Sequence, residues 1–148
     1  MEAILVKDQK AAAFVMEDGT FEGVYRITEK VCGDVEQVTG VRPKIIKWQG
    51  ALQPAQVYVA TLGNSEMSEA IAEEEGIELS SLCGKRECFL FQVLKNGSLL
   101  IAGSDKRGTI YGLFHISELM GVSPFVHFAD VVPAPQKEII FSEKDSMQ

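Results

Sequence analysis

The sequence contains few of the residues on which metal and redox chemistry depend. It has two histidines, three cysteines and one tryptophan in 148 residues. Neither histidine, His115 nor His127, has a metal-ligand spacing to a cysteine or a cluster of carboxylates, so we expect no metal and no cofactor. Three cysteines are too few for a disulfide scaffold, and no Cys-x-x-Cys pair occurs. Cys83 and Cys88 flank a turn-like segment, and the sequence leaves open whether they are bonded.

Basic residues are also in the minority. Lys and Arg number 14 against 21 Asp and Glu, which gives a formal net charge of -7. Nucleic-acid binding requires a basic face, and the basic residues here are scattered, so we expect no nucleic-acid partner. No run approaches the roughly 20 apolar residues that cross a bilayer, which argues against a membrane partner. The first ten residues do not resemble a signal peptide, and a larger parent protein could be cytoplasmic or secreted.

The remaining composition is that of an ordinary folded domain. Hydrophobic residues make up 46% of the chain and charged residues 24%, and no internal repeat is visible. Hydrophobic periodicity predicts one helix with an apolar stripe that ends at a glycine. The expected members of this stripe are Phe21, Val24, Ile27, Val31, Val35 and Val38, and the helix is expected to end at Gly40.

Further patterns predict two more helices and several strands. We expect a helix that begins at Asn64 or Ser65 and ends at Gly76, and another that ends at Gly121. The Asn-Gly turn at 96–97 predicts an antiparallel pairing of the strands on either side of it. The expected strands cover residues 11–17, 44–48, 56–62, 87–94 and 98–103, with a last extended region over 125–141. This order predicts a single α+β domain with a mixed sheet covered by about three helices, rather than a doubly wound parallel fold.

The segment Gly-Ser-Asp-Lys-Arg-Gly, residues 103–108, joins the last of these paired strands to the third helix. Its glycines and basic pair suggest an anion site, because N–H groups at a helix start lack partners. The segment lacks the Gly-Lys-Ser/Thr ending of a phosphate loop, however, and does not fit the dinucleotide fingerprint. We therefore favour a structural role, in which Ser104 or Asp105 caps the helix and Gly108 and Gly112 allow a strand to approach closely.

The basic pair in this segment has a second interpretation. Lys106 and Arg107 lie where a helix terminus is positive and could receive a carboxylate, either from another domain or from an acidic sugar. Elsewhere we find no nucleophile next to a base, and Asp34 is expected on a polar helix face. His115 is expected at the surface or at the boundary of the core, and Asp130 in a turn. No catalytic residue is predicted.

Several segments together resemble the N-terminal domain of glycoside hydrolase family 115, the xylan α-1,2-glucuronidases. They are DGTFEGVYRITEKVCGDVEQVTG, VYVATLG, GKRECFLFQV, IAGSDKRGTIYGLFHISELMGVSP and ADVVP, and they span nearly the whole chain. The stretch IAGSDKRGTIYG is the most specific of them. One departure precedes Ala-Asp-Val, where Phe125, His127 and Phe128 stand in place of the family's tryptophan-rich residues.

The resemblance implies a non-catalytic α+β domain, similar to the N-terminal domains of hexosaminidases and α-glucuronidases. In such proteins a TIM-like barrel follows and holds the acid/base carboxylates, which makes the barrel of the same chain the expected partner. The parent protein would remove glucuronic or 4-O-methylglucuronic acid from xylan. We expect residues 1–141 to form the domain and 142–148 a flexible tail. The residues expected to contact substrate or barrel are Ser104, Asp105, Lys106, Arg107, Phe125, His127 and Asp130. The alternative is a freestanding module that binds an acidic oligosaccharide or another protein.

Overall fold

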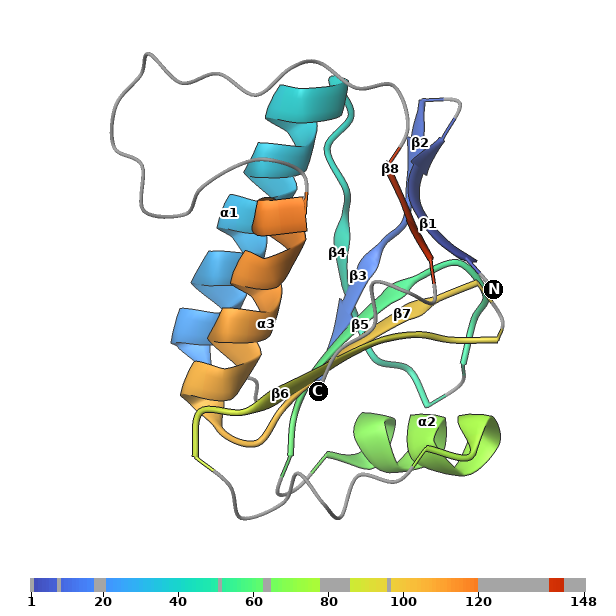
Figure 1. The fold of residues 1–148 in the computed structure, drawn as a ribbon, viewed down its shortest axis with the longest axis vertical. Coiled ribbons are helices and arrows are strands. Elements are labelled where there is room, and N and C mark those ends of the chain that lie inside the picture. The colour runs from blue at the N-terminus through green and yellow to red at the C-terminus, as the bar shows by residue number, and fades with distance from the viewer. Residues whose placement is uncertain are drawn as a thin grey trace.

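A computed structural model describes the chain over residues 2–7, 9–17, 21–50, 52–62, 65–77, 86–95, 97–119 and 139–142 (Figure 1). In these ranges the elements are β1 (Glu2–Lys7), β2 (Lys10–Ala11), β3 (Phe14–Met16), α1 (Glu22–Thr39), β4 (Ile45–Lys47), β5 (Val57–Thr61), α2 (Glu66–Glu75), β6 (Phe89–Val93), β7 (Leu99–Gly103), α3 (Lys106–Leu119) and β8 (Ile139–Ser142). None of the described helices is long and apolar enough to cross a membrane.

The larger sheet has five strands in the order β4-β3-β5-β7-β6. Its first four strands are parallel, and β6 runs antiparallel to β7. Helices α1 and α3 lie side by side on one face of this sheet, and α2 covers the other (Figure 1). Alternate residues of β5 point to opposite faces of the sheet. Val57 and Val59 pack in the core under α1 and α3, and Tyr58 and Ala60 pack in the core under α2. The carboxyl ends of β3, β5 and β7 therefore meet at one edge, where α1 and α3 begin.

The smaller sheet has three antiparallel strands in the order β2-β1-β8. It joins the first and last described strands, since Ala3 pairs with Phe141 and Ile4 with Ile140. The side chains of Ala3 and Phe141 are buried and extend the core that lies under α1 and α3. This sheet thus closes one end of that core with residues from both ends of the described chain.

The helix boundaries follow local chemistry. α1 ends at Gly40, whose φ of 81° is a left-handed conformation that glycine adopts without strain. The hydroxyl of Ser65 accepts a hydrogen bond of 3.0 Å from the backbone N–H of Ser68 and so caps α2, which ends at Gly76. The two expected ends of α1 and α2 at glycine, and the Ser65 cap, are confirmed.

The expected α+β class and mixed sheet are confirmed, and so are the strands around 45–47 and 57–61 and the antiparallel pairing of β6 with β7. The single strand expected over 11–17 is wrong, because Lys10–Ala11 and Phe14–Met16 belong to different sheets. The strand β1 was not predicted at all. Cys88 carries a free thiol, and Cys83 lies outside the described residues.

Two expectations about α1 are also wrong. Phe21, expected in the apolar stripe, is 51% exposed, because it precedes the helix as its N-cap and lies at the edge of the core. Asp34, expected on a polar face, is buried, because α3 packs against that side of α1 and Ser117 hydrogen-bonds the carboxylate. The other five members of the stripe are buried or pack against the core.

Candidate functional site

The corner between β7 and α3, residues 103–108, is the candidate site. β7 ends at Gly103 and α3 begins at Lys106, so the chain reverses direction within two residues. A Cβ atom added to Gly103 would lie 2.1 Å from the backbone nitrogen of Thr109, which is closer than any side chain tolerates. Thr109 itself is buried, and its hydroxyl lies 2.7 Å from that of Thr61 at the end of β5. The corner is therefore packed directly against the carboxyl end of the neighbouring parallel strand.

Asp105 organises the corner through both oxygens of its carboxylate. Oδ1 accepts a 2.8 Å hydrogen bond from the backbone N–H of Gly108, which caps the first turn of α3. Oδ2 accepts a 3.1 Å hydrogen bond from the backbone N–H of Glu87, on the segment that leads into β6. These two bonds stabilise the ionised form and hold the pKa of Asp105 below its ordinary value.

Ser104 and Gly108 fix the same segment from the other side. The backbone N–H of Ser104 donates to the carbonyl of Cys88 at 2.8 Å, and the Ser104 hydroxyl accepts from the Cys88 N–H at 3.0 Å. A Cβ atom added to Gly108 would lie 2.0 Å from that same Cys88 carbonyl oxygen. The expectations that Asp105 caps the helix and that Gly108 allows close approach match this geometry. Glycine is required at position 108 because the Cys88 carbonyl, immediately before β6, lies so close to it.

The basic pair separates into two different environments. Nη1 of Arg107 lies 2.8 Å from Oε1 of Glu87, and 74% of the Arg107 side chain is exposed. Hydrogen bonding to Glu87 raises the pKa of Arg107. Lys106 points the other way, because its Cε would be 2.8 Å from a Cβ atom at Gly23 in the first turn of α1. The two cations therefore do not form a clamp around a common point.

This geometry limits what the corner can bind. The Gly108 N–H, one of the donors that an anion would use, is already bonded to Asp105. The phosphate interpretation is thus disfavoured by the structure itself, since the carboxylate of Asp105 occupies the place of the anion. Among the described residues, no group of three or more His, Cys, Asp or Glu side chains is placed to hold a metal ion. The corner presents to a partner the exposed cations of Lys106 and Arg107 and the exposed carboxylate of Glu87.

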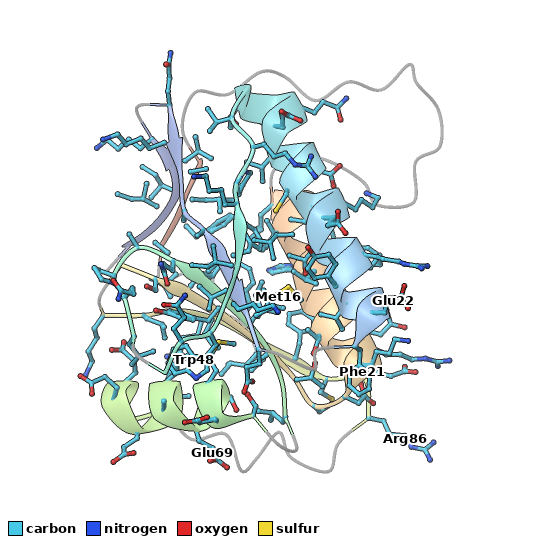
Figure 2. The ribbon with its side chains drawn as sticks, turned by 180° about the vertical axis from the view of Figure 1, so that it is seen from behind. Met16, Phe21, Glu22, Trp48, Glu69 and Arg86 are labelled. Carbon is cyan, nitrogen blue, oxygen red and sulfur yellow. The ribbon has the colours of Figure 1, made fainter. Side chains whose placement is uncertain are left out.

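An exposed aromatic residue lies at the same edge and was missed as a candidate. Phe21 precedes α1, where the carboxyl ends of the parallel strands meet, and Figure 2 shows it at the same end of the molecule as Arg86. Glu87 was also missed as a site residue. The structure gives it a φ of 54°, which is unusual for a non-glycine residue. No local pattern in the sequence distinguishes Glu87, because its partners Asp105 and Arg107 lie 18 and 20 residues further along the chain.

The other predicted site residues are not brought to this corner by any described contact. Phe125, His127 and Asp130 lie outside the described residues. His115 stands on α3 at the boundary of the core, with its ring centroid 4.7 Å from that of Phe91. Its Nδ1 lies 3.8 Å from the carboxylate of Glu118. The assignment of the corner to substrate or interdomain contact remains a prediction.

Comparison with known proteins adds a structural relationship. No family model matches the sequence, and no curated protein matches it. Among solved structures, a family GH115 4-O-methyl-α-glucuronidase, BtGH115A, described as having specificity for decorated arabinogalactans, matches 95% of this chain with a TM-score of 0.74 and 30% identity. CpGH84D also matches 95% of this chain, with a TM-score of 0.56 and 13% identity, which is a likeness of fold alone.

Both similar structures belong to much longer chains. The present chain spans 17% of BtGH115A and 21% of CpGH84D. The match to BtGH115A extends over nearly all of the segments on which the sequence resemblance rests. The resemblance of this chain to part of a glycoside hydrolase family 115 glucuronidase is therefore confirmed.

Proposed function

We propose that this chain is a non-catalytic accessory domain, N-terminal to the catalytic barrel of a family 115-like glycoside hydrolase. One observation carries the proposal: the chain matches 95% of its own length to BtGH115A but only 17% of that enzyme. A match of this extent is what one domain of a larger enzyme gives. The described elements form two layers of helices around a mostly parallel sheet.

The carboxylates at the candidate edge support a structural role. Both oxygens of Asp105 accept backbone hydrogen bonds. Glu17, which follows β3, accepts hydrogen bonds from the Ser65 hydroxyl and from the backbone N–H of Met67 at the start of α2. A glycosidase needs two carboxyl groups that face a sugar, and these two instead hold helix starts in place. The acid/base residues would then lie on the barrel, at the carboxyl ends of its strands.

We assign the contact with the barrel to the carboxyl edge of the larger sheet. Phe21 offers exposed apolar area there, and Lys106 and Arg107 offer exposed charge. Aromatic residues and arginine are among the residue types that protein interfaces favour. In this arrangement the domain buries that edge against the barrel and forms one side of the active-site rim.

The expected activity of the parent is the removal of glucuronic or 4-O-methylglucuronic acid from a plant polysaccharide. The resemblance predicts xylan as the polysaccharide, and BtGH115A is described as specific for decorated arabinogalactans. The uronic acid side chain is the chemistry that both have in common. Which polysaccharide backbone the parent enzyme acts on is therefore decided by assay.

The test compares two proteins on two substrates. The polypeptide encoded by the complete reading frame and the 148-residue chain are each incubated with glucuronoxylan and with a glucuronic-acid-decorated arabinogalactan, and released uronic acid is measured. We expect release only by the complete polypeptide. Turnover by the 148-residue chain alone contradicts the proposal, and so does a complete polypeptide that releases no uronic acid from either substrate.

A second candidate function is a freestanding module that binds an acidic oligosaccharide through Arg107. The exposed guanidinium at the start of α3 is the observation in its favour, although a sugar carboxylate would have to displace Glu87. Calorimetry with an aldouronic acid separates the two candidates. We expect no heat at millimolar ligand for the accessory domain. Micromolar binding that Arg107→Ala abolishes would favour the module.

A matched control exists for this measurement. Arg26, whose side chain is as exposed as that of Arg107, pairs with Glu22 at 2.6 Å on the solvent face of α1. Arg26→Ala removes the same charge without touching the corner. Binding lost in both variants would indicate a nonspecific effect of charge, and binding lost only in Arg107→Ala would support the module.

A further inference from the structure

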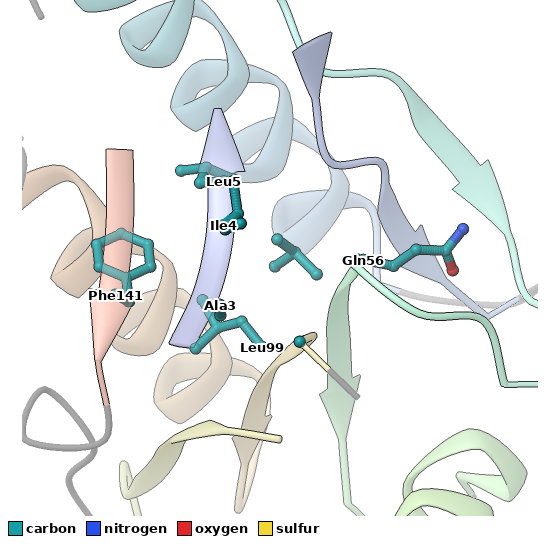
Figure 3. Close-up of a pocket in the computed structure, with 8 residues that line it drawn as sticks. Ala3, Ile4, Leu5, Gln56, Leu99 and Phe141 are labelled. Carbon is teal, nitrogen blue, oxygen red and sulfur yellow. The ribbon is translucent and has the colours of Figure 1, made fainter. Parts of the chain in front are cut away.

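We draw no further inference here: the strongest candidate, the apolar hollow between the buried side of the smaller sheet and the starts of β5 and β7 (Figure 3), is too small to hold even a water molecule and is lined by Ala3, Leu5 and Phe141 of the domain's own core.

Discussion

The carboxylate of Asp105 and the backbone N–H of Glu87 form a hydrogen bond of 3.1 Å, although 18 residues separate them in the sequence. The second oxygen of the same carboxylate caps α3 through the N–H of Gly108. One side chain therefore connects the start of a helix to the segment that enters the antiparallel strand β6. The candidate site owes its shape to this connection, because Arg107 meets Glu87 only when that segment is held in place.

Replacing Asp105 should destabilise the domain by an amount typical of a lost helix cap. Asp105→Ala removes acceptors for two backbone N–H groups, and we expect a loss of about 1–2 kcal/mol in the free energy of unfolding. Asp105→Asn retains one carbonyl oxygen and should lose less. Urea denaturation of the three proteins measures both changes. An alanine variant as stable as the unchanged protein would contradict the role of Asp105.

The same carboxylate should make stability depend on acid pH. Hydrogen bonds from Gly108 and Glu87 hold the pKa of Asp105 below its ordinary value in the folded protein. The unfolded chain therefore binds a proton more readily than the folded one. The stabilisation is present above the ordinary pKa of about 3.9 and is lost as the pH falls through the lower folded value.

The Asp105→Asn variant isolates this contribution, because asparagine does not titrate. We expect the free energy of unfolding of the unchanged protein to fall more steeply than that of the variant between about pH 5 and pH 2. Denaturation curves at a series of pH values check this. Parallel pH profiles for the two proteins would show that the hydrogen bonds of Asp105 do not favour its charged form.

Glycine at position 108 is required by contact and not by backbone angles. Gly108→Ala would place Cβ 2.0 Å from the Cys88 carbonyl oxygen, so either α3 or the strand must move. We expect a loss of about 2–3 kcal/mol or more, as for overpacking of a core. The melting temperature and urea midpoint should both fall.

Gly33, in the interior of α1, provides the opposite case. A Cβ atom there would meet only Nη1 of the exposed Arg42, at 3.4 Å, so the side chain can adjust. Alanine favours a helix interior by about 0.5–1 kcal/mol over glycine, and Gly33→Ala should therefore stabilise the protein slightly. Equal effects of the two substitutions would contradict the close approach of the strand to α3.

The fold was predictable wherever the signal is local. The α1 and α2 ends at Gly40 and Gly76 and the cap at Ser65 depend on residues within one turn. The β1 strand was missed because neither of its pairings carries a local signal: no Asn-Gly or Asp-Gly turn joins it to β2, and its other partner, β8, lies more than 130 residues away. Phe21 fits the helical period of apolar residues, but this period does not show that a residue at the N-cap of α1 lies outside the buried core.

The same division applies to the candidate site. Asp105 and Gly108 are three residues apart, so capping chemistry identifies both. Glu87 reaches the site only through the tertiary fold. Because it pairs with Arg107, this arginine is one partner of an ion pair and not a free cation. The sequence identifies the charged residues of the corner. The partner of Arg107 is known only from the structure, in which the segment before β6 lies against the start of α3.

A buried hydrogen bond between α1 and α3 leads to the last prediction. The Ser117 hydroxyl donates to Oδ2 of Asp34 at 2.9 Å, and Nζ of Lys30 lies 3.2 Å from the same oxygen. Both Asp34 and Ser117 are buried. Ser117→Ala should cost about 1–2 kcal/mol, because it removes a hydrogen bond to a charged group and leaves part of the carboxylate unsatisfied.

A double-mutant cycle isolates this contact from other effects of the substitutions. Asp34→Asn, Ser117→Ala and the double variant are compared by urea denaturation, and we expect a coupling energy of about 1 kcal/mol between the two positions. The exposed pair of Arg42 and Glu36, at 3.6 Å, serves as the control and should couple by less than about 0.5 kcal/mol. Additive effects at Asp34 and Ser117 would mean that α1 and α3 are held together by their apolar contacts alone, and that burial of the carboxylate is tolerated through Lys30.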